Sequence, residues 1–368
     1  MRPLPLLILA LTLASSLPAA EPYPLWDGHE TVADYARRVN LPPTKTLDLG
    51  DNLKLEFVLI PAGKFVMGTP EPVPVDEDGF RKKIMVGQAL VTASAAAILG
   101  ILVVVAIRAI RRRHRPQLSL GMLLVVTALA GCTVLSGVHW RQSAESLVTA
   151  QREHEAAVAR FQSATQSEKP AHSVTLIKPF YMGKYDVTQE QYQQVTDEHP
   201  SRFVGKDNPV ENVSWFEALN FCKKVSEKHG KPICLPTEAE WDFACRAGTT
   251  TNYFSGDGEE NLARMAWYRG NSSRTTHPVG QKEANGFGLF DMHGNVQNWC
   301  QDAYEDYTAD AVTDPQESAQ RSMRVLRGGA WPFPPVCCRS NFRDHGISSG
   351  RANDVGFRVV VPVSVREH

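Results

Sequence analysis

The stretch from Gly286 to Asp302, GFGLFDMHGNVQNWCQD, decides the fold of this chain. Glycines at positions 286, 288 and 294 mark tight turns or close backbone approach, and the apolar residues between them are suited to a core. The stretch also carries oxygen-bearing side chains, namely Asp291, Asn295, Asn298 and Asp302. Oxygen ligands crowded onto one loop are what a hard cation such as Ca²⁺ prefers. The alternative is a structural loop whose side chains bond to nearby backbone.

Further motifs lie on both sides of this stretch. They are IPAGKFVMG (Ile60–Gly68), PFYMGKYDVTQEQY (Pro179–Tyr192), NPVENVSWFEALNFC (Asn208–Cys222), LPTEAEWDFACRAG (Leu235–Gly248), RVLRGGAW (Arg324–Trp331), CRSNFR (Cys338–Arg343) and GFRVV (Gly356–Val360). Together with GLFDMHGNVQNW, these motifs and their order resemble the formylglycine-generating enzyme (sulfatase-modifying factor) family. The resemblance implies an α+β, loop-rich fold with a C-type-lectin-like core. It also implies one discontinuous domain made of residues 51–68 and 172–363.

The residue pattern predicts the elements of that domain. Alternating apolar residues predict a strand from Leu53 to Leu59. Ser214 with Glu217, and Thr237 with Glu240, form capping-box patterns, which predict helices over Trp215–Lys228 and Thr237–Cys245. A further helix is expected over Val187–Val195.

The segments outside the domain indicate membrane attachment. Residues 1–20 have the pattern of a signal peptide, with an uncleaved anchor as the alternative, and 21–50 form an N-terminal segment. The apolar runs 84–107 and 118–138 are each long enough for a transmembrane helix, with buried helices of a soluble core as the alternative. Residues 141–166 are expected to form a helical stalk, or else to be disordered.

These two spans predict a two-helix transmembrane hairpin inserted into the domain. The arginine-rich loop between the spans favours the cytoplasm, and the signal peptide places the globular part outside. We therefore expect a membrane-anchored protein whose globular domain is periplasmic or extracellular. The formal net charge of −1 gives no indication of a nucleic-acid partner.

The chain has seven cysteines, of which Cys132 lies in an apolar run. The other six permit many disulfide pairings, and the sequence does not choose among them. They are Cys222, Cys234, Cys245, Cys300, Cys337 and Cys338.

The resemblance implies a catalytic site that binds Cu(I) through two cysteines and uses O₂ to convert a cysteine of a client sulfatase to formylglycine. Cys338 stands at the second of these positions and is the candidate catalytic residue, but Phe333 stands at the first. Ala330 and Gln297 replace a serine and a tryptophan of active members. Since Cu(I) needs two soft ligands, Cu(I) binding is not expected. Cys337 could supply a second thiol, although adjacent cysteines of an extended chain point in different directions.

The resemblance also implies a calcium site. Its ligands would be the side chains of Asp291 and Asn298 and the backbone carbonyls of Gly294 and Val296. Ca²⁺ is therefore the expected cofactor, at a site weakened because the neutral Asn298 replaces a glutamate of the family.

Two functions of different classes follow. The first is a non-catalytic binding or scaffold module with a protein partner or a sulfatase-like client. The second is a formylglycine-generating oxidoreductase. Phe333 discriminates between them, since an active enzyme needs cysteine there, and it favours the binding module.

Overall fold

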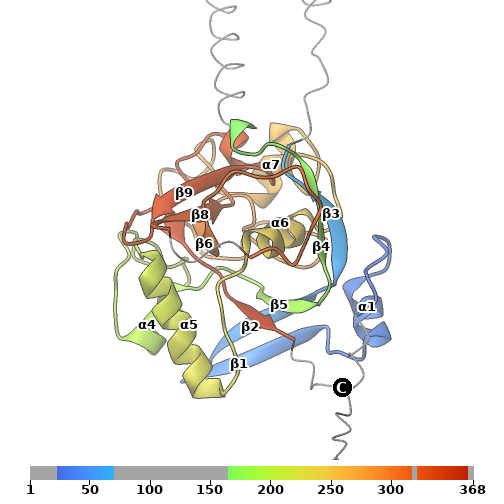
Figure 1. Ribbon diagram of the computed structural model, residues 1–368. Helices are drawn as coiled ribbons and strands as arrows, with labels where there is room; N and C mark the ends of the chain where they lie inside the picture. The colour runs from blue at the N-terminus through green and yellow to red at the C-terminus, as the bar shows by residue number, and fades with distance from the viewer. Residues whose placement is uncertain (1–22, 70–164, 317–320, 364–368) are drawn as a thin grey trace, which may run out of the picture. The chain divides into compact units, whose positions relative to one another are not determined.

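Three small sheets and a set of short helices make up the domain seen in the computed structural model (Figure 1). The structure describes residues 23–69, 165–316 and 321–363, all of which belong to one compact unit. The predicted signal peptide 1–20 and the apolar runs 84–107 and 118–138 lie outside the described residues. So does the predicted stalk, apart from its last two positions.

The first sheet joins the N-terminal part of the domain to its C-terminal strand. Its order is β1 (Thr44–Gly50), β2 (Leu53–Ile60), β5 (Phe180–Gly183) and β11 (Val360–Pro362), and every neighbouring pair is antiparallel. Asp51 and Asn52 connect β1 to β2 with φ of 52° and 65°. This left-handed backbone is typical of a tight hairpin turn.

The second sheet contains β3 (Gly63–Met67), β4 (His172–Leu176) and β7 (Val312–Thr313). β3 and β4 are antiparallel, and Met67 pairs with His172. Beyond the strands, the Thr69 amide donates to the Glu168 carbonyl at 2.9 Å. Residues on either side of the segment 70–164 are therefore directly bonded within this domain.

The third sheet carries most of the remaining motifs. Its order is β10 (Val355–Gly356), β6 (Gln297–Ala303), β8 (Met323–Arg327) and β9 (Arg343–Ile347). β10 runs parallel to β6, and the other pairs are antiparallel. The organising stretch 286–302 thus ends in an interior strand of this sheet.

The helices of the described residues are α1 (Val32–Arg38), α4 (Gln189–Thr196), α5 (Trp215–His229), α6 (Glu238–Arg246), α7 (Glu259–Met265) and the 3₁₀ helix η1 (Pro335–Cys338). Four of them, α1, α4, α5 and α6, begin after an N-cap residue whose side chain accepts a hydrogen bond from the first turn. Thr188, Ser214 and Thr237 each form a capping box, which satisfies amides that the first turn leaves unbonded. The predicted helices at 215–228 and 237–245 are confirmed to within a residue.

α6 occupies the centre of the domain. It packs against β3 and β4 of the second sheet and against β6 and β8 of the third (Figure 1). Its Trp241, Phe243 and Ala244 are buried in an apolar cluster with Leu289 and Met292 of the organising stretch. A second apolar cluster lies under α4 and α5, where Tyr192 and Phe221 stack with their ring centroids 5.8 Å apart.

Acidic residues of α6 are also buried, and arginines from two motifs pair with them. Arg343 forms hydrogen bonds of 2.6 and 2.8 Å to the two carboxylate oxygens of Glu238. Arg327 lies 2.9 Å from Asp242 and donates to three carbonyls of residues 340–342. Burial alone would raise the pKa of Glu238, but Arg343 and Arg327 outweigh it and hold this pKa below its ordinary value.

The predicted fold class needs a correction. We expected an α+β domain with an inserted two-helix transmembrane hairpin, but no helix of the described residues is long and apolar enough to cross a bilayer. Even α5, with 15 residues, is shorter than the roughly 20 that a span requires. Among the described residues the fold is therefore the α+β domain, and the predicted transmembrane hairpin is not seen in them.

Candidate functional site

Cys338 lies at the end of η1, facing the turn between β8 and the loop that follows. Its side chain is fully buried in a small apolar cluster with Tyr253, Leu262 and Met265. A Cβ atom on Gly329 would lie 2.7 Å from the Cys338 sulfur, so only glycine allows this close approach. Burial, with a smaller contribution from Cys337, raises the pKa of the Cys338 thiol, against a hydrogen bond from the Ala330 amide. The thiol is therefore uncharged at neutral pH.

Phe333 stands at the position where the family resemblance implies a second thiolate. Its ring packs against the apolar cluster that contains Cys338 and lies edge-on to Phe342 with centroids 6.5 Å apart. The Phe333 amide donates to the Ala330 carbonyl, and its own carbonyl accepts from the Arg269 amide. Phe333 is thus held by both its backbone and its ring, and the pocket beside Cys338 is apolar.

Cys337 does not replace the missing ligand. It precedes Cys338 in a 3₁₀ helix rather than in the extended chain assumed from the sequence. Consecutive residues of such a helix point about 120° apart. In agreement, Cys338 is buried while Cys337 is half-buried. Burial raises the pKa of Cys337 to about 11, so neither thiol is a ready soft ligand.

His293 is the residue of the organising stretch that reaches Cys338. Its Nδ1 donates to the Cys338 carbonyl at 2.8 Å, and its Nε2 accepts from the Phe254 amide at 3.2 Å. Burial lowers the pKa of His293 to about 4. The ring is neutral and committed to two backbone groups, so its role is to hold the loops together.

Gln297, at the position where active members have tryptophan, is buried and donates to Asp344 Oδ2 at 3.2 Å. Ala330 is fully buried. These two side chains, with Phe333, offer no thiolate, nucleophile or general base.

The predicted calcium ligands lie close in the chain, but the side-chain oxygen of Asn298 and one oxygen of Asp291 already accept hydrogen bonds. Asn298 Oδ1 accepts from Trp241 Nε1 and from Arg358 Nε, both at 2.9 Å. An amide oxygen has two acceptor sites, so both are occupied. The Asn298 amide group in turn donates to Asp186 Oδ1 at 2.9 Å. Asn298 therefore connects a helix, an ion pair and the sheet.

Other polar side chains of the stretch have similar roles. Asn295 exchanges two hydrogen bonds with the backbone of His277, at 2.9 and 3.0 Å. Asp302 accepts from the Glu238 amide at the start of α6. Gly294 lies so close to Trp267 that a Cβ would stand 2.4 Å from its carbonyl oxygen. These contacts are structural, but they reach distant parts of the chain rather than the nearby backbone that the structural-loop interpretation expected.

Asp291 differs from its neighbours. It is buried with φ of 58°, and its Oδ2 accepts from the Gly280 amide at 2.8 Å. Its Oδ1 is buried with no hydrogen-bond partner among the described residues. Burial, followed by the nearby Asp186, raises the pKa of Asp291 to about 7, although Arg358 and Lys282 oppose this.

The calcium set as a whole does not fit the ion. Besides the backbone carbonyls of Gly294 and Val296, it offers one side-chain oxygen without a hydrogen-bond partner among the described residues, Asp291 Oδ1, and the neighbouring Asp186 Oδ2 would add one more. Ca²⁺ takes six to eight oxygen ligands. The Arg358 guanidinium, bonded to both Asn298 and Asp186, places a fixed positive charge beside the same position. The described residues contain no cluster of three or more His, Cys, Asp or Glu side chains suited to a metal.

Sequence reasoning missed Asp186 and Arg358. Their side chains form a buried ion pair of 2.9 Å that touches Asn298. Both lie inside motifs that were recognised, KYDVT and GFRVV, but their charges were given no role. Each of the two motifs places one charged residue among apolar neighbours. Because charged residues are almost never fully buried unless they are paired, this placement could have predicted an ion pair.

Comparison with known proteins places these observations in a family. Residues 144–363 match the family described as "Sulfatase-modifying factor enzyme 1-like domain". The chaperone protein LppX of Paenibacillus barcinonensis is 27% identical over 289 residues, which cover 65% of this chain and 97% of that protein. The formylglycine-generating enzyme of Mycobacterium tuberculosis is 32% identical over 183 residues, which cover 43% of this chain and 58% of the enzyme.

A solved structure shows the same fold. The variable protein 1 of Treponema denticola superposes with a TM-score of 0.58 at 24% identity, covering 88% of this chain and 100% of that one. The family match covers more than half of the chain and includes the organising stretch, α6 and the third sheet. The chain therefore belongs to the sulfatase-modifying factor enzyme 1-like domain family.

Proposed function

We propose that this domain is a non-catalytic binding module for a protein partner and does not generate formylglycine. The observation that carries the proposal is Phe333, whose packed ring stands where a second copper-binding thiolate is needed. Two thiolates are required to hold Cu(I), and one buried, protonated Cys338 cannot do so alone.

The preserved parts of the domain support a role that depends on its surface. The capping boxes, the ion pairs of α6 and the tied loops of the organising stretch are all intact. Phe333, at a position where the resemblance implies cysteine, would remove the copper chemistry while leaving the loop framework able to present a surface. LppX, which matches over nearly its whole length, is named a chaperone protein, and this name favours a protein as the partner.

The first test measures the reaction itself. The purified full chain would be incubated with Cu(I), O₂, a reductant and a peptide carrying a Cys-x-Pro-x-Arg motif. We expect mass spectrometry to detect no aldehyde. The matched variant is Phe333→Cys, which restores a second thiol beside Cys338, and we expect it to gain Cu(I) binding. Aldehyde formation by the natural chain, lost in Cys338→Ala, would establish the oxidoreductase function instead.

The second test measures binding. Light scattering of a chemically denatured sulfatase would be followed on dilution, with and without an equimolar amount of the full chain. We expect the chain to reduce aggregation, and serum albumin at the same concentration serves as the control. No difference from albumin would remove the support for a chaperone-like client, even if the chain also lacks enzymatic activity.

A further inference from the structure

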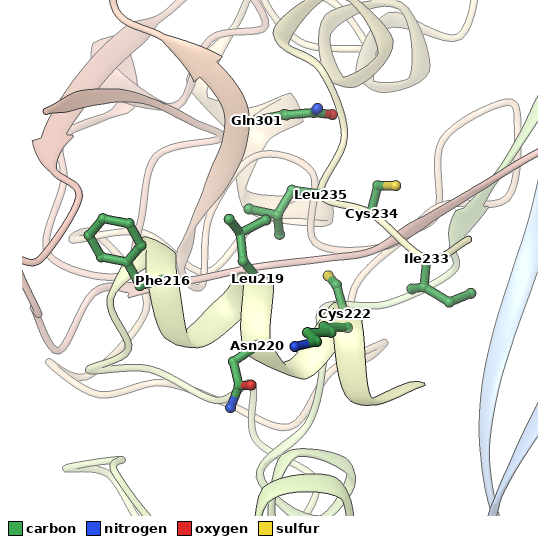
Figure 2. Close-up of a pocket in the computed structure, with 9 residues that line it drawn as sticks. Phe216, Leu219, Asn220, Cys222, Ile233, Cys234, Leu235 and Gln301 are labelled. Carbon is green, nitrogen blue, oxygen red and sulfur yellow. The ribbon is translucent and has the colours of Figure 1, made fainter. Parts of the chain in front are cut away.

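A surface pocket separate from the Cys338 site lies between α5 and the segment that leads into α6. It has a volume of about 450 Å³. Figure 2 shows apolar residues from both sides lining it, together with the thiols of Cys222 and Cys234. Cys222 comes from the middle of α5, and Cys234 comes from the chain that follows the helix. Two nucleophilic side chains thus share a pocket to which the proposed function gives no role.

One hydroxyl holds the two cysteine-bearing segments together. Ser226 Oγ, one turn after Cys222, donates to the Cys222 carbonyl at 2.7 Å. The same oxygen contacts the Ile233 carbonyl at 3.3 Å and accepts from the Ile233 amide at 2.8 Å. The backbone next to Cys234 is therefore fixed against the turn of α5 that follows Cys222.

The backbone of Cys234 is held on its other side as well. Its amide donates to the Val360 carbonyl at 3.0 Å, and its carbonyl accepts from the Val360 amide at 2.8 Å. Cys222 is buried, whereas Cys234 is partly open to solvent, and both are free thiols in the structure. The backbone on both sides of the pocket is therefore held by hydrogen bonds, and the two sulfur atoms, which point in different directions in Figure 2, meet only after side-chain rotation.

We propose that Cys222 and Cys234 are a thiol pair that forms an intramolecular disulfide when a disulfide oxidant, such as oxidised glutathione, reaches the pocket. The bond would staple the middle of α5 to the segment before α6. It also removes the Cys234 thiol from the pocket wall. The pairing is local, since the closed loop runs only from residue 222 to residue 234, so forming it needs no rearrangement of the sheets.

The reaction takes place in two exchange steps. Cys234, the more accessible thiol, loses its proton and attacks the oxidant, forming a mixed disulfide and releasing one glutathione thiolate. Cys222 then loses its proton and attacks the Cys234 sulfur, which forms the intramolecular bond and releases the second glutathione. The two cysteines are oxidised by two electrons, and the oxidised glutathione is reduced to two thiols.

Burial makes both steps slow at neutral pH. It raises the pKa of Cys222 and of Cys234, and only the thiolate attacks a disulfide. The rate of cross-linking should therefore rise with pH through the alkaline range. This dependence separates the exchange chemistry from metal-catalysed damage to other residues.

The test is a cross-link map of the full chain. The protein would be equilibrated with oxidised glutathione, alkylated without reduction and digested with a protease that cuts after glutamate. Cleavage at Glu238 or Glu240 separates Cys234 from Cys245, so a linked peptide identifies the pair. We expect the Cys222–Cys234 peptide, and a melting temperature raised by roughly 5 °C, because a short cross-link restricts the unfolded chain.

Variants make the assignment decisive. Cys222→Ser and Cys234→Ser should each abolish the cross-link, while Cys337→Ser should retain it. Cys222→Ser should also accumulate glutathione on Cys234, because the resolving thiol is missing. If the natural chain instead keeps glutathione on Cys234, or leaves both thiols free after oxidation at pH 9, the proposal is wrong. None of these readouts depends on formylglycine formation or client binding.

Discussion

Two buried polar regions of this domain differ in how completely their charges are paired. Under α6, Glu238 faces Arg343 and Arg327, and Tyr307 donates to the same carboxylate at 2.8 Å. In the organising stretch, Asp291 is equally buried, but it has no ion-pair partner among the described residues, and its Oδ1 accepts no hydrogen bond from them.

The residues of the α6 network therefore stabilise the fold, whereas ionised Asp291 lowers its stability. In a buried network where each charge faces an opposite charge, losing any member is costly, because its partner would then lie unpaired. A buried carboxylate with an unpaired oxygen is itself a source of instability when ionised. Substitutions in the two regions should therefore act in opposite directions.

The largest effect is expected for Arg327→Met. The change removes the charge that faces Asp242 at 2.9 Å and three hydrogen bonds to carbonyls. Breaking a buried pair in this way costs about 3–5 kcal/mol of unfolding free energy. Urea unfolding followed by tryptophan fluorescence would measure the loss.

The matched control is Arg264→Met. Arg264 pairs with Glu283 at 2.7 Å, but both side chains are more than half exposed. Exposed pairs contribute about 0–1 kcal/mol, so this variant should unfold almost as the natural chain does. If both arginine variants lose the same small amount, the buried network does not stabilise the fold as described here.

Asp291→Asn should instead stabilise the domain at alkaline pH. The folded-state pKa of about 7 lies above the ordinary value of 3.8. The folded state therefore binds a proton more tightly than the unfolded state between about pH 4 and pH 7, and stability falls as pH rises through this window. The neutral amide removes that fall, so the variant should be more stable at pH 8 by roughly 2 kcal/mol.

The measurement is the unfolding free energy at pH 5 and pH 8. Asparagine tolerates the left-handed backbone at this position, which limits side effects on the loop. Asp310→Asn, at an exposed position, controls for the loss of one negative charge. A variant that is less stable than the natural chain at pH 8 would mean that ionised Asp291 has a stabilising partner.

Local signals made much of the framework predictable. Ser214 with Glu217, and Thr237 with Glu240, predicted where α5 and α6 begin, because a capping box is complete within four residues. Alternating apolar residues predicted β2 for the same reason. The ordered motifs carried the family, which the comparisons confirm.

The site was less predictable because its contacts join distant parts of the chain. Asp186 and Arg358 are 172 positions apart, and both meet Asn298. A sequence shows that Asn298 carries an oxygen, but not that a tryptophan and an arginine already donate to it. Phe333 was informative even without knowledge of its contacts, because the family resemblance implies a cysteine at this position.

Cys338→Ala should lower the unfolding free energy by about 1 kcal/mol, a smaller change than those expected for Arg327→Met and Asp291→Asn. The change leaves a small cavity in the apolar cluster with Tyr253 and Met265, and cavities cost stability in proportion to their size. No charge is left unpaired, since the thiol is protonated. Urea denaturation would measure the change in unfolding free energy. A loss above about 3 kcal/mol would indicate a further role for the sulfur.

The smallest effect is expected from calcium itself. Since Asn298 Oδ1 already accepts two hydrogen bonds and Arg358 lies beside it, Asp291 and the carbonyls of Gly294 and Val296 offer too few oxygens to hold the ion. A ligand that binds only the folded state raises its stability by mass action, so the melting temperature should be the same in millimolar Ca²⁺ and in chelator. The comparison belongs at pH 8, where Asp291 is ionised and any calcium affinity would be greatest. A calcium-dependent rise that disappears in Asp291→Asn would show that the loop rearranges to bind the ion, with the Asp291 oxygen as a ligand. A rise that persists in Asp291→Asn would place the calcium elsewhere in the chain and leave the contrast between the two regions intact.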